Sequence, residues 1–188
     1  MNICVFCSSS DAVDKKYFLS AGRLGKEMVK EGYSLVYGGA NRGLMQAIAD
    51  SVIEAGGKVT GVIPQALHDY GISKQGLDEL IITEDMRKRK SVMEEKSAAF
   101  IFLPGGIGTL EEAMEILTLK QLHYHEKALV FLNTGGFYKK LMDVFKLMEK
   151  EKFIKKDLYK MFYFAKDEKA AVKYIKNYKP KKTGGKWF

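Results

Sequence analysis

The chain has 188 residues, of which 46% are hydrophobic and two are cysteines. This composition is typical of one globular domain with a substantial core, and it excludes a disordered chain, a collagen-like repeat and a disulfide-stapled miniprotein. The net charge of +8 comes from the C-terminal quarter, because residues 139–188 carry 16 basic and 6 acidic side chains, whereas residues 1–138 carry 15 and 17.

Lysines are concentrated near the C-terminus, where a charge run can contact nucleic acid or anionic lipid. Solvated lysines near a chain end are common, so we expect a basic tail at 179–188 and no nucleic-acid partner. The first residues contain no basic n-region, and the apolar runs are far shorter than the ~20 residues that span a bilayer. These features predict a soluble cytoplasmic protein with no signal peptide and no membrane contact.

Short apolar runs alternate with amphipathic stretches along the chain. Because the runs are almost continuously apolar, they indicate strands that are buried on both faces. The expected strands are 2–7, 33–37, 58–63, 79–83, 98–103, 128–132 and 161–164. The expected helices are 15–32, 42–56, 86–97, 109–124, 137–150 and 167–178. This alternation predicts one α/β domain over residues 1–178, with a parallel sheet and helices on both faces.

Ligands of such folds bind beyond the carboxyl ends of the strands. The first strand is followed by Ser8-Ser9-Ser10-Asp11, which either binds a polar ligand or caps the next helix. Cys4 and Cys7 have C-x-x-C spacing but fall within the strand, so we expect no redox function.

Glycines follow the second strand, where Gly38 and Gly39 allow close backbone approach to a ligand. Gly43 opens the next helix, whose free amides and dipole favour an anion.

The segment 104–109, which reads Pro-Gly-Gly-Ile-Gly-Thr, directly follows the expected strand at 98–103. Its glycines expose backbone N–H groups and Thr109 is expected to cap the helix, which predicts a phosphate cradle. The spacing matches neither a P-loop nor a dinucleotide fingerprint. A single phosphate, as in a nucleoside monophosphate, fits better.

Charged residues flank this cradle. Glu111 and Glu112 are adjacent in a helix, so at most one of them faces the ligand squarely. Of the cluster 87–90, which reads Arg-Lys-Arg-Lys, only one or two cations can point into one site. The three histidines are not accompanied by a ligand set, so we expect no metal and no cofactor.

The segment Pro104-Gly105-Gly106-x-Gly108-Thr109-x-x-Glu112 resembles the signature P-G-G-x-G-T-x-x-E of the LOG ("Lonely Guy") family. Members of this family are cytokinin riboside 5′-monophosphate phosphoribohydrolases and are often mislabelled as lysine decarboxylases. Further family motifs resemble segments of this chain in the same order, at 38–45, 61–64, 86–90 and 133–138.

The resemblance implies a Rossmann-like fold, a homodimer and hydrolysis of the N-glycosidic bond of an adenine-type nucleoside 5′-monophosphate, either a cytokinin nucleotide or AMP. Arg89 and Glu112 match the catalytic residues of the family. The expected substrate-binding residues are Ser8, Gly38, Gly39, Gly43, Met45, Arg89, Lys90, Gly105, Gly106, Ile107, Gly108, Thr109, Leu110, Glu111 and Thr118.

The chain departs from the family pattern at Gln46 and at 118–125, where a Trp and a Gly are lost, and this leaves the base preference open. Two other functions are compatible with the fold. One is a non-catalytic nucleotide or cofactor carrier similar to the molybdenum-cofactor carriers, and the other is a nucleic-acid-binding protein. Retention of both Arg89 and Glu112 favours the enzyme, because a carrier needs the cradle but not the acid.

Overall fold

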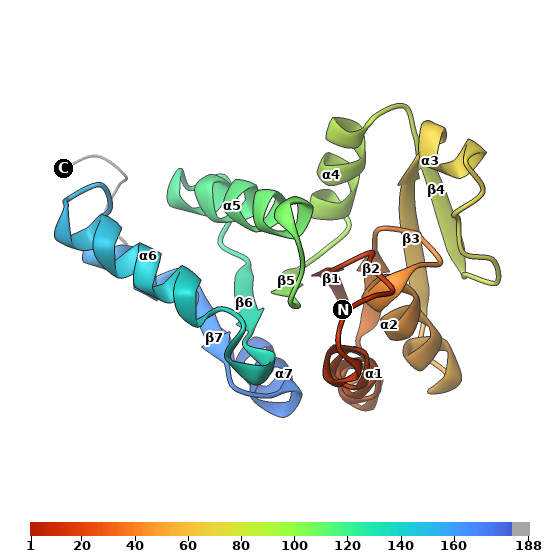
Figure 1. Ribbon diagram of the computed structural model, residues 1–188, viewed down its shortest axis with the longest axis horizontal. Helices are drawn as coiled ribbons and strands as arrows, with labels where there is room; N and C mark the ends of the chain where they lie inside the picture. The colour runs from red at the N-terminus through yellow and green to blue at the C-terminus, as the bar shows by residue number, and fades with distance from the viewer. Residues whose placement is uncertain (182–188) are drawn as a thin grey trace.

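The computed structural model describes residues 1–181, in which seven parallel strands form one sheet (Figure 1). The strand order is β4-β3-β2-β1-β5-β6-β7, so the chain winds outward from β1 to one edge and then restarts beside β1 with β5. The strands are β1 (Asn2–Phe6), β2 (Ser34–Tyr37), β3 (Val59–Pro64), β4 (Glu79–Thr83), β5 (Ala99–Phe102), β6 (Ala128–Leu132) and β7 (Tyr163–Ala165). The reversal between β1 and β5 creates the crevice in which open α/β sheets bind ligands.

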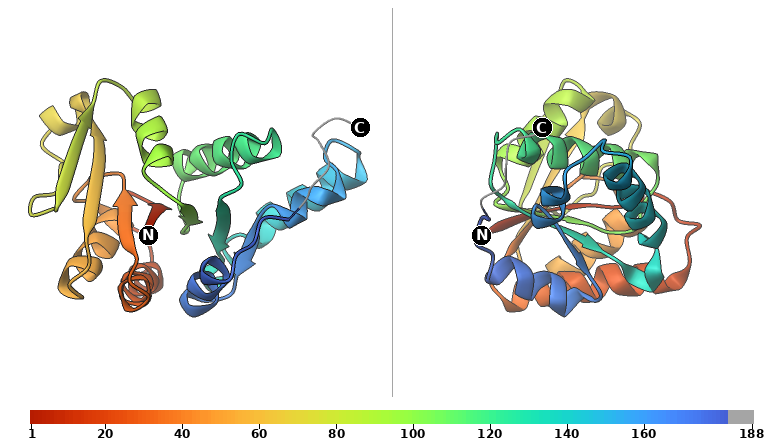
Figure 2. Two further views of the ribbon diagram at one scale, coloured as in Figure 1. Left: turned by 180° about the vertical axis from the view of Figure 1, so that it is seen from behind. Right: turned by 90° about the vertical axis from the view of Figure 1, so that its left-hand side faces the viewer.

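Helices cover both faces of this sheet, as the views along and across the strands show (Figures 1 and 2). They are α1 (Lys15–Lys30), α2 (Gly43–Glu54), α3 (Gln65–Asp69), α4 (Met86–Glu95), α5 (Ile107–Gln121), α6 (Lys139–Lys150) and α7 (Glu168–Lys176). Helices α1, α2 and α7 pack on one face, and α4, α5 and α6 pack on the other. Two short 3₁₀ turns lie at Thr134–Gly136 and Lys156–Lys160.

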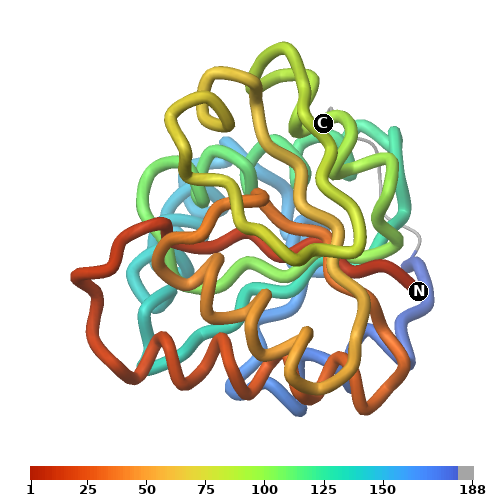
Figure 3. The backbone as a smooth tube through the Cα atoms, turned by 90° about the vertical axis from the view of Figure 1, so that its right-hand side faces the viewer, coloured from red at the N-terminus to blue at the C-terminus, as the bar shows by residue number. Residues whose placement is uncertain are grey.

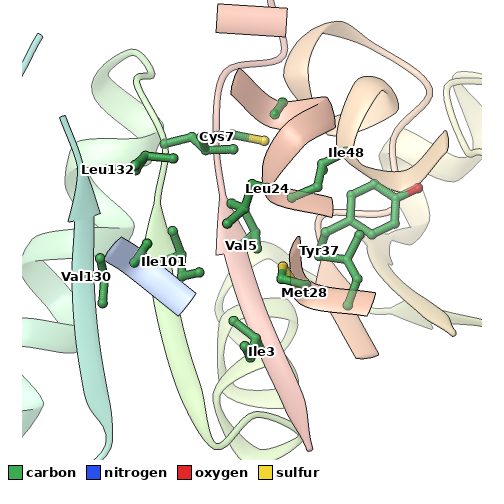
Figure 4. Packing of buried hydrophobic residues seen from close by; sticks show 14 of the residues in the cluster. Ile3, Val5, Cys7, Leu24, Met28, Tyr37, Ile48, Ile101, Val130 and Leu132 are labelled. Atoms are coloured by element: carbon green, nitrogen blue, oxygen red, sulfur yellow. The ribbon is translucent and has the colours of Figure 1, made fainter. Parts of the chain in front are cut away.

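The core is divided by the sheet into two layers. Ile3 and Val5 of β1, and Cys7 just after it, lie in one cluster with Leu24 and Met28 of α1 (Figure 4). The alternate residues of β1, among them Cys4 and Phe6, join a second cluster on the opposite face that is rich in phenylalanine. The two cysteines therefore lie on opposite faces of the sheet, both as buried free thiols, in keeping with the expectation that they are not a redox pair.

Helices α1 and α2 run close together along one side of the molecule (Figure 3). A Cβ atom at Gly25 of α1 would lie 2.9 Å from the hydroxyl oxygen of Ser51 in α2, so glycine is required for this approach. The Ser51 hydroxyl donates to the carbonyl oxygen of Gly22, which fastens the two helices.

The structure confirms the predicted α/β class, the seven strands and the helices on both faces, with shifts of one to three residues at most element ends. Helix α3 was not predicted, because five residues between two strands carry no amphipathic period. Asp14 caps α1, so the helix-capping interpretation of Ser8–Asp11 is wrong. Helix α5 ends at Gln121, which places His123 and His125 in the following loop. Of the expected tail at 179–188, residues 182–188 lie outside the described part of the chain.

A buried carboxylate joins helices α1 and α7. Glu168, in the first turn of α7, accepts hydrogen bonds from the Ser20 hydroxyl (2.6 Å) and from Arg23 Nη2 (2.8 Å) and Nε (3.2 Å). Burial would raise the pKa of Glu168, but the hydrogen bonds from Arg23 and Ser20 outweigh it and hold the pKa below its ordinary value. The ionised form is therefore the one that stabilises the fold.

We predict that Glu168→Gln lowers the free energy of unfolding by roughly 1–3 kcal/mol at neutral pH, since charge-assisted hydrogen bonds are lost. A group whose pKa is lowered by folding stabilises the protein above its unfolded pKa and loses this contribution as the pH falls. The difference between the two proteins should therefore shrink below the ordinary glutamate pKa of 4.5. Urea unfolding at several pH values measures it, with the exposed Glu54→Gln as control. A difference that persists unchanged at low pH would contradict this account.

Candidate active site

A pocket of about 540 Å³ lies at the carboxyl ends of the central strands, where β1 and β5 separate the two halves of the sheet. Three loops that follow β1, β2 and β5 enclose it together with the start of α4. Of the residues predicted from the sequence, the structure brings into this pocket Ser8, Gly38, Met45, Arg89, Gly106, Ile107, Gly108, Thr109 and Glu112.

The loop after β1 is fastened to the start of α2. The carboxylate of Asp11 accepts a hydrogen bond from the Gly43 amide (2.9 Å), and the Ser8 carbonyl accepts one from Leu44 (2.9 Å). A Cβ atom at Gly43 would lie 2.5 Å from the Ser9 carbonyl carbon, so this contact requires glycine. The first two amides of α2 are thus engaged within the protein, so the amides of Gly43 and Leu44 are not free to bind an anion.

The N-terminus of α5 opens into the pocket. Its N-cap residue is Gly106, which has no side chain to accept from the first amides of the helix, and Gly106, Ile107, Gly108 and Thr109 line the cavity. Thr109 lies inside the helix, so the expectation that it caps α5 is also wrong. The amides of a helical first turn have no intrahelical acceptor, and the helix dipole favours negative charge there. This part of the pocket is suited to bind an anion such as a phosphate.

A buried ion pair lies beside this anion site. Nη1 of Arg89, from α4, is 3.5 Å from Oε1 of Glu112 in α5, and both side chains are about one-tenth exposed. Arg89 Nε donates to the carbonyl oxygen of Val62 in β3 (3.0 Å), which fixes the direction of the guanidinium group. A Cβ atom at Gly38 would lie 2.0 Å from Arg89 Nη2, so the absence of a side chain at this position makes room for the cation.

The environment of the pocket shifts the pKa of the Glu112 carboxyl group. Burial raises the pKa of Glu112 to about 7, the charge of Arg89 opposes this rise, and the neighbouring Glu111 adds to it. A carboxyl group with a pKa near neutrality changes its protonation state readily at physiological pH, which suits general acid–base or electrostatic catalysis.

Several predicted site residues lie outside the pocket. Lys90 forms ion pairs with Glu111 and Glu115 on the surface of α4 and α5, so neither Lys90 nor Glu111 lines the cavity. The role of Gly105 is to make room for Thr109, whose hydroxyl would lie 2.1 Å from a Cβ atom there. The remaining predicted residues that do not line the cavity are Gly39, Gly43, Leu110 and Thr118.

The pocket also contains residues that the sequence did not single out as binding residues. Leu67 and Ile72, on α3 and the loop after it, provide an apolar wall, and no motif marked them because α3 itself was not predicted. Ser9, Ser10, Arg42 and Met86 also line the cavity and lie within motifs that were recognised as segments. Within residues 1–181 no group of three or more His, Cys, Asp or Glu side chains is arranged to hold a metal ion.

A family model described as "Possible lysine decarboxylase" matches residues 45–175 of the chain. The chain belongs to this family, the LOG family. It is 39% identical over 182 residues to cytokinin riboside 5′-monophosphate phosphoribohydrolase LOG5 of Arabidopsis thaliana. This alignment covers 97% of this chain and 80% of the relative. It is 44% identical over 155 residues to the probable phosphoribohydrolase LOGL1 of Oryza sativa subsp. japonica, covering 82% of this chain and 70% of the relative.

Solved structures with the same fold include molybdenum-cofactor proteins. The molybdenum cofactor carrier protein of Chlamydomonas reinhardtii superposes with a TM-score of 0.71 at 23% identity, covering 93% of this chain and 95% of that one. The molybdenum cofactor binding protein of Rippkaea orientalis gives a TM-score of 0.72 at 20% identity, covering 93% and 94%. At these low identities, the likeness shows only that the two proteins and this LOG family member have the same fold.

We predict that Arg89→Gln raises the pKa of Glu112 above its value of about 7, because it removes the positive charge that favours the carboxylate. Lys90→Gln should raise this pKa less, since Lys90 contributes less to it than Arg89 does. Infrared difference titration of the carboxyl band, assigned with Glu112→Gln, measures both shifts. A Glu112 pKa near 4.5 in the unmodified protein, or a fall in Arg89→Gln, would show that burial does not dominate.

Proposed function

We propose that this LOG family member hydrolyses the N-glycosidic bond of adenine-type nucleoside 5′-monophosphates, giving the free base and ribose 5-phosphate. The observation that carries the proposal is the buried pair of Arg89 and Glu112 beside the open N-terminus of α5. The relatives at 38–44% identity, which are named cytokinin riboside 5′-monophosphate phosphoribohydrolases, support the same reaction.

The 5′-phosphate binds at the first turn of α5, where Gly106 and Gly108 line the pocket and the first amides of the helix have no side-chain cap. Arg42, which also lines the pocket and lies 3.7 Å from the Asp11 carboxylate, adds positive charge, and the hydroxyl groups of Ser8–Ser10 provide further polar contacts. Fixing the phosphate at one end makes its binding energy available to orient the sugar against the catalytic side chains.

Glu112 acts on the sugar. Cleavage of a ribosyl C1′–N bond builds positive oxocarbenium character on the ribose, which a nearby carboxylate stabilises while it holds a hydroxyl group or the attacking water. Arg89 favours the ionised form of Glu112 that this role requires, because its charge lowers the carboxyl pKa against the effect of burial. The apolar side chains of Leu67 and Ile72 provide a surface for the base.

The carrier function is less favoured than catalysis. A carrier needs the anion site at α5 but has no use for a buried carboxylate next to it, since a negative charge repels an anionic cargo. Family membership further leads us to propose a homodimer that works in the cytoplasm. Within residues 1–181, no helix has the length and apolar character needed to traverse a bilayer.

We predict that Glu112→Gln keeps its fold and its affinity for AMP but loses about 100-fold or more in turnover, as expected when one electrostatic stabiliser is removed from a buried site. Glu111→Gln is the matched control, because Glu111 precedes it on the same helix, pairs with Lys90 and lies outside the pocket. Release of free base is followed by chromatography. Undiminished turnover in Glu112→Gln would remove Glu112 from the mechanism.

The requirement for the 5′-phosphate provides an independent test of the proposed reaction. AMP and isopentenyladenosine monophosphate should both release free base, whereas adenosine should react at least about 100-fold more slowly because it lacks the phosphate that α5 binds. The ratio of the two monophosphate rates ranks the base preference. No free base from any of the three compounds would refute the phosphoribohydrolase reaction and favour the carrier.

A further inference from the structure

A second concave surface of about 540 Å³ lies on α7 and the edge strand β7. We call it the tyrosine–lysine trough, because its lining includes Tyr163, Lys173, Tyr174, Tyr178, Lys179 and Lys181. Tyr163 begins β7, whereas Tyr178 follows the end of α7, which runs back along the sheet. The trough is therefore near the amino ends of the strands, away from the pocket at their carboxyl ends.

Three aromatic rings form a continuous series in the trough. The rings of Tyr163 and Tyr174 are stacked, with centroids 4.6 Å apart and planes inclined by 11°. The ring of Tyr178 follows that of Tyr174 at 5.6 Å. All three side chains are half-buried, so part of this aromatic surface remains open to a ligand.

A buried lysine holds the last of these rings in place. Lys120 is 4% exposed, and its Nζ donates to the hydroxyl oxygen of Tyr178 (2.7 Å) and to the carbonyl oxygen of Lys127 (2.6 Å). The same Nζ lies 4.8 Å from the centre of the Tyr178 ring. An ordered side chain loses less entropy when a ligand stacks on it, so this contact prepares the ring for binding.

The charge of the trough is positive. Lys173, Lys179 and Lys181 line it, and no carboxylate is among its lining residues in the described part of the chain. Lys176, on the same helix, pairs instead with Glu31, which follows α1, and does not line the trough. Positive side chains interleaved with aromatic rings suit a ligand that combines a flat base with a phosphate.

We propose that the tyrosine–lysine trough is a second nucleotide-binding site, which stacks a base on its tyrosines and holds phosphate among its lysines. The nucleotide is either free or part of a single strand. This inference is independent of the proposed reaction, and it revises the expectation that the C-terminal lysines are merely solvated. That expectation considered their charge alone and overlooked the tyrosines between them.

Two pyrimidine probes test the proposal, so that binding does not depend on the adenine-type site. One is a labelled oligothymidylate of about ten nucleotides, followed by fluorescence anisotropy, and the other is uridine triphosphate, followed by equilibrium dialysis. Binding of the oligomer alone identifies a single strand as the ligand, and binding of both identifies the nucleotide unit itself. Failure of both probes to bind at concentrations up to about 1 mM, which corresponds to a binding free energy of about −4 kcal/mol, overturns the proposal.

Two lysine variants of α7 test whether the probes bind at the trough. Lys173→Gln should weaken binding about threefold or more and reduce the slope of log affinity against log salt by about 0.7, as expected for one lost phosphate contact on a single strand. Lys169→Gln is the control, since Lys169 is an exposed residue of α7 that does not line the trough. Equal losses in the two variants would show non-specific attraction and overturn the site.

The aromatic contribution is tested at Tyr174. Tyr174→Ala should weaken binding about fivefold or more because a stacking ring is removed, whereas Tyr174→Phe should bind like the unmodified protein. The phenylalanine variant keeps the stacking with Tyr163 and separates ring loss from misfolding. Equal affinity in Tyr174→Ala would contradict base stacking. Release of base from AMP should be unchanged in Lys173→Gln, because the trough is separate from the pocket.

Discussion

Two opposite charges are buried side by side at the carboxyl edge of the sheet, and most of the site is arranged around them. A buried arginine or glutamate is costly unless it is paired and hydrogen-bonded. Arg89 meets this requirement with the Val62 carbonyl on one side and Glu112 on the other, and Gly38 leaves the space that the guanidinium group occupies. The pair therefore holds α4, β3, the loop after β2 and α5 in one geometry. Disturbing any of these contacts changes the pKa or the position of the Glu112 carboxyl group, on which the proposed chemistry depends.

The position of the pair follows from the topology. Because the strand order reverses between β1 and β5, the loops after these strands diverge and leave a crevice that neither covers. Helix α5 begins at this crevice with Gly106, whose lack of a side chain leaves the amides of the first turn exposed to the pocket. An anion site and an acid–base group thus lie within the first two turns of the same helix. In the proposed reaction, this proximity allows the start of a single helix to position both the phosphate and the reacting sugar.

The strands and the parallel sheet could be predicted because buried strands have a simple apolar pattern. Arg89 and Glu112 were indicated by the resemblance to the LOG family, and the structure pairs them in the pocket at the strand ends. Prediction from the sequence failed where the answer depended on which way a side chain points. Lys90 and Glu111 lie one residue from Arg89 and Glu112, yet they form ion pairs with each other on the surface. Gly43 and Gly105 were assigned to phosphate binding, but they make room for Ser9 and Thr109. Leu67 and Ile72 were missed because only the folded chain brings the short helix α3 and its loop to the pocket.

The two native thiols also affect how this protein can be studied. Cys4 and Cys7 are both buried, and burial raises the pKa of each thiol above its ordinary value, so the reactive thiolate is scarce at neutral pH. A cysteine introduced on the surface of α7 would therefore react with a maleimide dye far faster than either native residue. Site-specific fluorophores or spin labels can be attached without first replacing the native cysteines, which leaves the packing of β1 undisturbed.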